Sequence, residues 1–208
     1  MYVKKPMEIE NKSMNIIDEV MGDTNFSEEE MIIAKRMIHT TGDFEYRKMI
    51  DFTGDFINTA KQAIKEGVTI YTDTKMVHAG INKKALDKAN CKLKYFIDDE
   101  RAYSLSKELS TTRSSCAIDL AVNEGLSIFV IGNAPTALFR ILELVDEGKL
   151  EPRFVIGVPV GFVGAAESKE LLREYKDIPS ISTVGYKGGS NVAASIINAL
   201  LYMVVGRD

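Results

Sequence analysis

The sequence LSIFVIGNAPTALFRILELVDE, residues 126–147, decides the expected fold. It opens with a near-continuous apolar run from Leu126 to Ile131, interrupted only by Ser127, which is typical of a strand buried on both faces. The next residues, Gly132-Asn133-Ala134-Pro135-Thr136, have the form of a strand end, a helix cap and a proline in the first helical turn. Apolar residues then recur at helical spacing as far as Glu147. The stretch therefore predicts a buried strand followed by an amphipathic helix.

The same alternation of short apolar runs and helical patterns extends along most of the chain. Further strands are expected over residues 68–71, 93–97, 154–160 and 181–184. Helices are expected over residues 8–21, 28–40, 55–66, 102–109, 113–123, 167–175 and 191–204. Ser27 and Glu30 form a capping box at the start of the second helix, and Gly42 closes it. Apolar strands between amphipathic helices indicate a Rossmann-like, three-layer α/β/α fold with a mainly parallel central sheet, in a single domain over residues 1–208.

Composition excludes several classes of protein. Apolar residues make up 45% of the 208 residues, charged residues make up 27%, and the net charge is −4 without an acidic or basic block. Nucleic-acid binding therefore has no electrostatic basis. The most apolar stretch, from Val192 to Val205, is too short to span a bilayer and predicts a buried helix. Residues 1–6 lack the apolar stretch of a signal peptide, and Cys91 and Cys116 fit neither a disulfide framework nor a metal site. We therefore expect a cytoplasmic protein with Cys116 in its core.

The segments that leave the predicted strands are rich in Gly, Ser, Thr, Asn and Asp, namely residues 72–76, 132–136, 161–165 and 185–191. In open α/β sheets, ligands bind beyond the carboxyl ends of the strands. Backbone N–H groups and helix N-termini at this edge favour anionic ligand groups. We therefore expect the site to be built from these segments.

His39 is one of only two histidines and lies at the end of a predicted amphipathic helix, with Arg36 on the same face. Histidine is the residue type whose ordinary pKa lies nearest neutrality, so it suits proton transfer. The alternative is a helix-end histidine that bonds a carbonyl or Asp43. His78 has no neighbours that suggest a triad or a metal site, so we interpret it as a surface or packing residue.

Other polar residues are open to two interpretations. Ser13 lies on an apolar helical face, where its hydroxyl bonds either a ligand or its own helix backbone. Arg113 opens a predicted helix against the helix dipole, so an anion is expected beside it, either a ligand carboxylate or a protein carboxylate. The sequence Lys187-Gly188-Gly189-Ser190-Asn191 is either a close backbone approach to a ligand or a tight turn with a cap.

Established catalytic motifs are missing from the sequence. The spacing of Gly157, Gly161 and Gly164 is not that of a dinucleotide fingerprint, and Lys187-Gly188-Gly189-Ser190 does not match a P-loop. There is no Ser-His-Asp elbow and no Cys or His cluster for zinc. From the residues alone, the sequence predicts an α/β protein with an anion-friendly site at the strand ends and one acid–base histidine.

The chain also resembles the precorrin-8X methylmutases over nearly its whole length. The resemblance rests on residues 9–13, 36–43, 73–77, 80–81, 112–114, 131–139, 157–170 and 187–194. Ser115 and Cys116 replace the small residues expected after Arg113. Tyr186 stands where arginine is commoner, which weakens any carboxylate-binding role at that position.

The resemblance implies an isomerase that moves a methyl group from C11 to C12 of (cobalt-)precorrin-8, giving cobyrinate or hydrogenobyrinate. It implies His39 as the catalytic acid–base residue. Ser13, Arg36 and Arg113 are implied substrate contacts, together with the turn of Gly188, Gly189 and Asn191. It also implies a homodimer with the site near the subunit interface and no organic cofactor or protein-bound metal. A non-catalytic corrinoid-binding protein and a nucleotide-dependent α/β enzyme are the alternative hypotheses.

Overall fold

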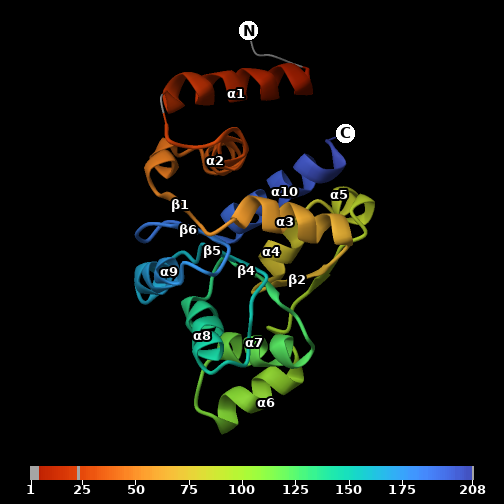
Figure 1. The fold of residues 1–208 in the computed structure, drawn as a ribbon, viewed down its shortest axis with the longest axis vertical. Coiled ribbons are helices and arrows are strands. Elements are labelled where there is room, and N and C mark those ends of the chain that lie inside the picture. Colours follow the sequence, from red (N-terminus) through yellow and green to blue (C-terminus); the bar gives the residue numbers. More distant parts are fainter. Residues whose placement is uncertain (1–4, 23, 208) are drawn as a thin grey trace.

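A six-stranded sheet forms the centre of the computed structural model, which describes residues 5–22 and 24–207 (Figure 1). The strands follow the order β1-β6-β5-β4-β2-β3, and all neighbours are parallel except β1, which runs antiparallel to β6. The strands are β1 (Ile50–Thr53), β2 (Thr69–Thr72), β3 (Lys92–Lys94), β4 (Ile128–Ile131), β5 (Phe154–Gly157) and β6 (Ser180–Thr183). The predicted mainly parallel sheet is therefore confirmed.

Helices cover both faces of this sheet. The long helices are α1 (Pro6–Met21), α2 (Glu28–Thr41), α3 (Phe56–Glu66), α6 (Glu100–Glu108), α7 (Arg113–Asn123), α8 (Pro135–Asp146), α9 (Ala165–Glu174) and α10 (Ser190–Val205). The short ones are the 3-10 helix η1 (Phe44–Lys48), α4 (Lys75–Gly80) and α5 (Lys83–Lys88). The predicted capping box of Ser27 and Glu30 is present at the start of α2, and Gly42 closes that helix in the left-handed conformation.

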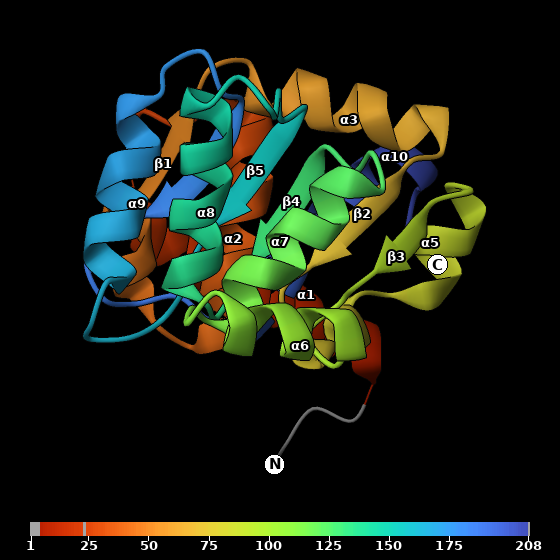
Figure 2. The same ribbon diagram turned by 90° about the horizontal axis from the view of Figure 1, so that it is seen from below.

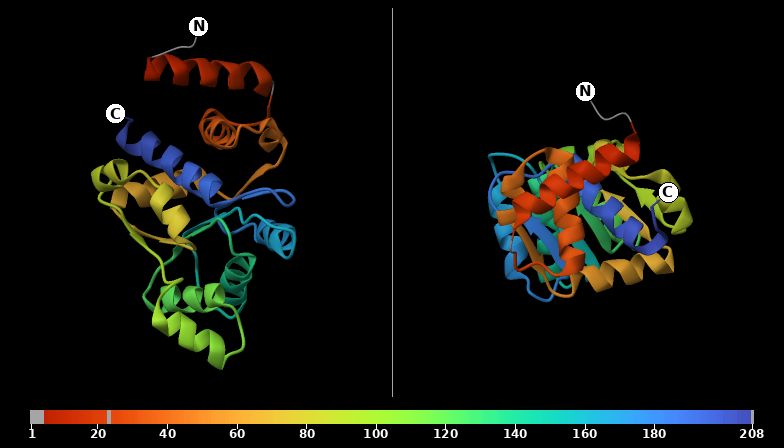
Figure 3. Two further views of the ribbon diagram at one scale, coloured as in Figure 1. Left: turned by 180° about the vertical axis from the view of Figure 1, so that it is seen from behind. Right: turned by 90° about the horizontal axis from the view of Figure 1, so that it is seen from above.

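Alternate strand residues enter two separate cores, which gives the three layers. Phe154 and Ile156 of β5 belong to the core shared with α3 and α10, whereas Val155 belongs to the core shared with α7 and α8. Figure 2 shows α6, α7 and α8 in front of the sheet. On the other face, α1 and α2 form an outer pair over α10, as the view from above in Figure 3 shows.

The sequence prediction was wrong at two strands and missed a third. In the run over 154–160, strand β5 ends at Gly157. The amide of Val158 still donates to the carbonyl of Ile131 at 2.9 Å, and Pro159 then has no N–H group to extend the ladder. The run over 93–97 forms only the three-residue edge strand β3. Strand β1 was not predicted because its four residues, which pair along one side only, lack a long apolar run.

The apolar stretch near the C-terminus forms the predicted buried helix, α10. It packs against α2, α3 and α4, and its residues are buried on nearly every side because layers lie both below and above it. Cys116 is buried in the other core, as predicted. Within the described residues, no helix is long and apolar enough to cross a membrane.

The free energy of unfolding should depend strongly on Leu200, which is 0% exposed in α10. Leu200→Ala is expected to lower it by about 2–5 kcal/mol, because truncation removes apolar contacts and leaves a cavity. The matched control is Leu109→Ala, at a leucine that is 58% exposed after α6, with an expected change of about 0.5 kcal/mol. Urea unfolding measures both values, and equal losses would contradict the proposed core.

Candidate active site

The predicted strand-end segments meet at the carboxyl edge of the sheet. The hydroxyls of Thr74, after β2, and Ser190, at the start of α10, are 3.1 Å apart. The amide of Gly161, after β5, donates to the carbonyl of Tyr186, after β6, at 3.2 Å. The start of α7 joins the same edge, because Thr112 donates to Thr136 of α8 at 2.8 Å. One continuous surface is therefore built from segments far apart in the sequence.

Asp73 closes one part of this edge, and the sequence analysis assigned it no role. Its carboxylate, 1% exposed, accepts hydrogen bonds from the backbone N–H groups of Gly132 (3.1 Å), Asn133 (2.7 Å) and Ala134 (2.9 Å). Burial raises the pKa of Asp73, and the three N–H groups act in the opposite direction. The carboxylate thus occupies the crevice between β2 and β4, where the strand order reverses and an anionic ligand is otherwise expected.

The free helix N-termini lie on the other side of that crevice. The N-cap residues of α9 and α10 are Gly164 and Gly189, neither of which provides a capping side chain. By contrast, Thr74 and Thr112 cap α4 and α7 with their own hydroxyls. The first turns of α9 and α10, after β5 and β6, are therefore the places where backbone N–H groups can receive anionic ligand groups.

The glycine turn, Lys187-Gly188-Gly189, has a packing reason for its glycines. A Cβ on Gly188 would lie 2.1 Å from the carbonyl oxygen of Val158. Gly189 has φ +133° and donates its N–H to the same carbonyl at 2.9 Å. The tight-turn interpretation is thus supported by the structure, while close approach of a ligand stays a prediction. The side chain of Asn191 is exposed one residue into α10.

His39 lies in the last turn of α2, and its side chain is exposed. The chain that follows is fixed to the glycine turn, because Lys187 Nζ contacts Asp43 Oδ2 at 2.5 Å and Tyr46 donates to the carbonyl of Gly188 at 3.4 Å. The bond from Lys187 lowers the pKa of Asp43. Asp43 is therefore engaged by Lys187 rather than by His39, and within the described residues the imidazole has no hydrogen-bond partner.

Arg36 and Ser13 lie where α1 crosses α2. Arg36 Nη2 contacts Glu10 Oε1 at 3.1 Å, and its guanidinium lies 5.6 Å from the centre of the Tyr202 ring. Burial lowers the pKa of Arg36. Ser13 donates to the carbonyl of Ile9, 2.9 Å away in its own helix, which is the backbone alternative that the sequence left open. Substrate contact by either residue stays a prediction, and for Arg36 it requires competition with Glu10.

Arg113 is exposed as the first residue of α7, at the carboxyl edge. In the part of the chain that the structure describes, no carboxylate pairs with its guanidinium. The salt bridge to a protein carboxylate, one of the two alternatives from the sequence, is therefore not formed among these residues. The guanidinium of Arg113 is available to an anionic ligand. No contact joins Arg113 directly to the end of α2, so these two predicted groups occupy different parts of the same edge.

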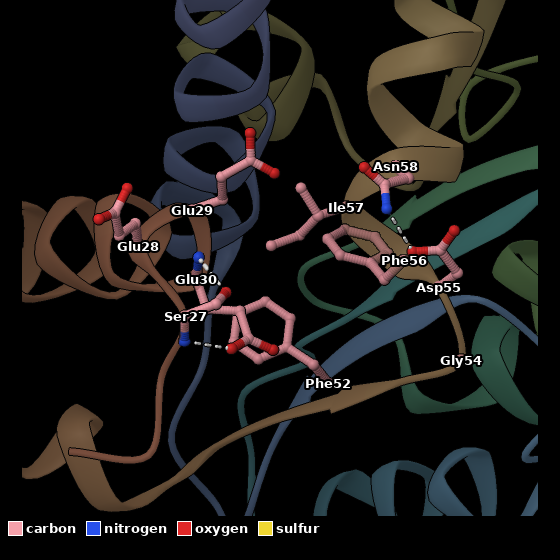
Figure 4. Close-up of a pocket in the computed structure, with 10 residues that line it drawn as sticks. All are labelled: Ser27, Glu28, Glu29, Glu30, Phe52, Gly54, Asp55, Phe56, Ile57 and Asn58. Atoms are coloured by element: carbon pink, nitrogen blue, oxygen red, sulfur yellow. Dashed lines mark hydrogen bonds between the residues drawn. The ribbon is translucent and has the colours of Figure 1, made fainter.

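A hollow at the opposite edge has the wrong charge for an anionic ligand. Figure 4 shows it between the start of α2 and the segment after β1, with the carboxylates of Glu28, Glu29 and Asp55 around it. Asp55 accepts a hydrogen bond from Asn58 at 2.8 Å, which fixes its side chain beside the hollow. The excess of acidic side chains would repel a polycarboxylate, so this hollow is a poor site for one.

Comparison with known proteins identifies the family. Residues 8–203 match the precorrin-8X methylmutase family. The chain belongs to this family. The cobalt-precorrin-8 methylmutase of Salmonella typhimurium is 42% identical, with 97% of both chains covered. The enzyme of the same name from Methanocaldococcus jannaschii is 43% identical, with 95% of this chain and 94% of the relative covered.

Solved structures of the methylmutase family agree with the fold. The crystal structure of the precorrin-8x methyl mutase from Thermus thermophilus superimposes with a TM-score of 0.89 at 33% identity, and 97% of this chain and 98% of that chain are covered. The Rossmann-like three-layer prediction and the family resemblance are both confirmed. Methylmutases of this family are isomerases, and the fold supplies them with the carboxyl edge described above.

The Asp73 carboxylate should be essential to the shape of this edge. Asp73→Asn is expected to lower the free energy of unfolding by about 1–3 kcal/mol, because an amide NH₂ then faces a backbone N–H donor. Asp98→Asn makes the same charge change at an exposed carboxylate, paired with Lys75 at 2.5 Å, and should cost about 0–1 kcal/mol. Thermal unfolding of the two variants measures the difference. An Asp73→Asn variant as stable as the wild type would show that the three N–H groups do not need the carboxylate as their hydrogen-bond acceptor.

Proposed function

We propose that this methylmutase moves a methyl group from C11 to C12 of precorrin-8 or cobalt-precorrin-8, in cobalamin biosynthesis. The observation that carries the proposal is the match of almost the whole chain to enzymes named for this substrate. The carboxyl edge is consistent with it, because the substrate bears many acetate and propionate groups. Backbone N–H groups at the starts of α9 and α10 suit these carboxylates, as does Arg113, which has no ion-pair partner in the described part of the chain.

His39 is the proposed acid–base residue. The methyl shift is intramolecular and requires no nucleophile. The protein must therefore bind the rearranged, conjugated ring more tightly than the substrate ring, and must donate and recover one proton. The imidazole is exposed and has no hydrogen-bond partner among residues 5–22 and 24–207, so it is free to contact the ring. Its helix end is fixed to the glycine turn through Asp43 and Lys187, so a macrocycle held by that turn lies beside the imidazole. We also propose substrate contacts for Gly188, Gly189 and Asn191 at this turn, and for Ser13 and Arg36 where α1 crosses α2.

We also propose that the enzyme is a homodimer and works in the cytoplasm. Ile9, Ile16 and Val20 share one face of α1, and all three are more than a third exposed. Such a stripe on an outer helix suits contact with a second copy of the chain. Ser13 lies on the same face, which would put the proposed substrate contacts near the interface. Two buried free thiols, Cys91 and Cys116, are in keeping with a reducing compartment.

Replacing His39 should separate catalysis from binding. In His39→Ala, the rate of isomerisation is expected to fall by about 10²–10⁴-fold because the proton-transfer group is lost. Binding of hydrogenobyrinate should persist because its carboxylates are held elsewhere. The visible spectrum of the product reports turnover, and fluorescence or spectral titration reports binding. His78→Ala is the control, since that ring packs edge-on against Tyr95, 5.0 Å away. Undiminished turnover in His39→Ala would favour the non-catalytic corrinoid-binding alternative.

The α1 stripe should determine the oligomeric state. Ile16→Glu places a charge on a position that is 47% exposed in one chain, and it should convert a dimer to monomers because the carboxylate would be buried in the interface. Leu109→Glu, on the far side of the sheet, should leave the dimer intact. Sedimentation velocity distinguishes the two species. A dimer that tolerates Ile16→Glu would place the interface elsewhere.

A further inference from the structure

Lys169 is a buried cation to which the proposed reaction assigns no role. It lies in α9, and its side chain is 0% exposed. Its ammonium donates to the carbonyl of Lys187 at 2.8 Å and to Thr183 Oγ1 at 3.2 Å. Within residues 5–22 and 24–207, no carboxylate forms an ion pair with it. The positive charge therefore lies directly beneath the glycine turn without a counter-ion from the described chain.

Hydrogen bonding to the loop does not by itself explain a lysine at this position. Thr183 already donates to the Lys187 carbonyl at 2.7 Å, so that acceptor is satisfied without the ammonium. An apolar side chain of similar length would fill the space without the cost of burying a charge. This cost lowers the pKa of Lys169 to about 8. Burial is the main cause, and the nearby charge of Arg173 has a smaller effect.

The Lys169 ammonium lies where it can hold the glycine turn in place. The Lys187 peptide that it holds leads into Gly188 and Gly189 and then into the first turn of α10, which has no capping side chain. The Lys187 side chain extends the other way to Asp43 and Glu45, beside the end of α2. One buried ammonium thus contacts the link between the carboxylate-binding turn and the helix that carries His39.

We propose that Lys169 is a positioning residue for substrate binding, which fixes the glycine turn and adds positive charge beneath the site for the substrate's carboxylates. The inference rests on the proposed function. The charged groups that face the ammonium and its acceptor are Arg173 on α9, the Lys187 side chain, and Asp43 and Glu45 of the η1 segment. Arg173 repels the ammonium. Lys169, Arg173 and Lys187 carry three positive charges against the two carboxylates, so this group has one positive charge in excess, which favours a polyanion.

The decisive comparison is Lys169→Met with Lys149→Met. Both remove one positive charge, but Lys149 is an exposed residue after α8, paired with Glu147 at 2.6 Å. In Lys169→Met, the KM for cobalt-precorrin-8 and the Kd for hydrogenobyrinate are expected to rise at least tenfold, with kcat changed less than threefold. Lys149→Met should change each value less than twofold. Unaltered KM and Kd in Lys169→Met would overturn the proposal.

Stability provides the readout that separates positioning from a purely structural role. The pKa of Lys169 in the folded protein lies below that of a lysine in the unfolded chain. The unfolded state therefore binds more protons between about pH 8 and pH 10.5. Through this effect the free energy of unfolding of the wild type increases as the pH rises across that range. Lys169→Met should lack this gain and should be as stable as wild type, or more stable, at pH 7. A variant that is clearly less stable at pH 7, with normal binding by its folded fraction, would show that the lysine serves the fold alone.

The same experiment distinguishes the two proposals. If the wild-type enzyme does not convert cobalt-precorrin-8 or precorrin-8, the proposed function fails. If the wild type turns over normally and Lys169→Met matches it in KM, Kd and pH dependence, only the role of Lys169 fails. Affinity of the wild type for hydrogenobyrinate should also fall above about pH 8, as the ammonium loses its proton, whereas the weaker binding by Lys169→Met should lack that component.

Discussion

The contact between Lys187 and Asp43 determines the geometry on which the proposed site depends. It joins two segments 144 residues apart, the end of α2 with His39 and the glycine turn that opens α10. An ion pair this exposed contributes little to the free energy of unfolding. It matters through its position, because it holds the end of α2, which carries the proposed acid–base residue His39, beside backbone N–H groups that suit carboxylates. Tyr46 supports the arrangement through its bond to the Gly188 carbonyl.

The carboxyl edge is divided into a closed part and an open part. Between β2 and β4, where α/β sheets with this strand order usually receive a ligand, the Asp73 carboxylate takes the N–H groups of Gly132, Asn133 and Ala134. After β5 and β6, the first turns of α9 and α10 lack capping side chains. The Asp73 carboxylate thus serves as an internal anion between β2 and β4, and the N–H groups after β5 and β6 are left to an anionic ligand. Lys169, below the open part, adds to the same preference.

Local signals made much of the fold predictable from the sequence. The apolar run that ends at Ile131, the Ser27–Glu30 capping box and the buried α10 each depend on neighbours in the chain, and all three are present. Strand β1 was missed because only its pairing with β6 defines it. The hydrogen bonds of Asp73 and Lys169 were also missed, because their partners are distant in the sequence and cannot be read from the adjacent residues. His39 was singled out by its position and the family resemblance, and its catalytic role stays a prediction, whereas the pairing of Arg36 with Glu10 required the structure.

The most direct measurement of the central claim is a crystal structure of the protein with hydrogenobyrinate bound. The account predicts that the imidazole of His39, from one subunit or its partner, contacts ring C of the macrocycle. It also predicts carboxylates of the ligand at the glycine turn and at the first N–H groups of α10. A macrocycle bound in the acidic hollow near Asp55, or with the imidazoles of both subunits out of contact with ring C, would contradict the account.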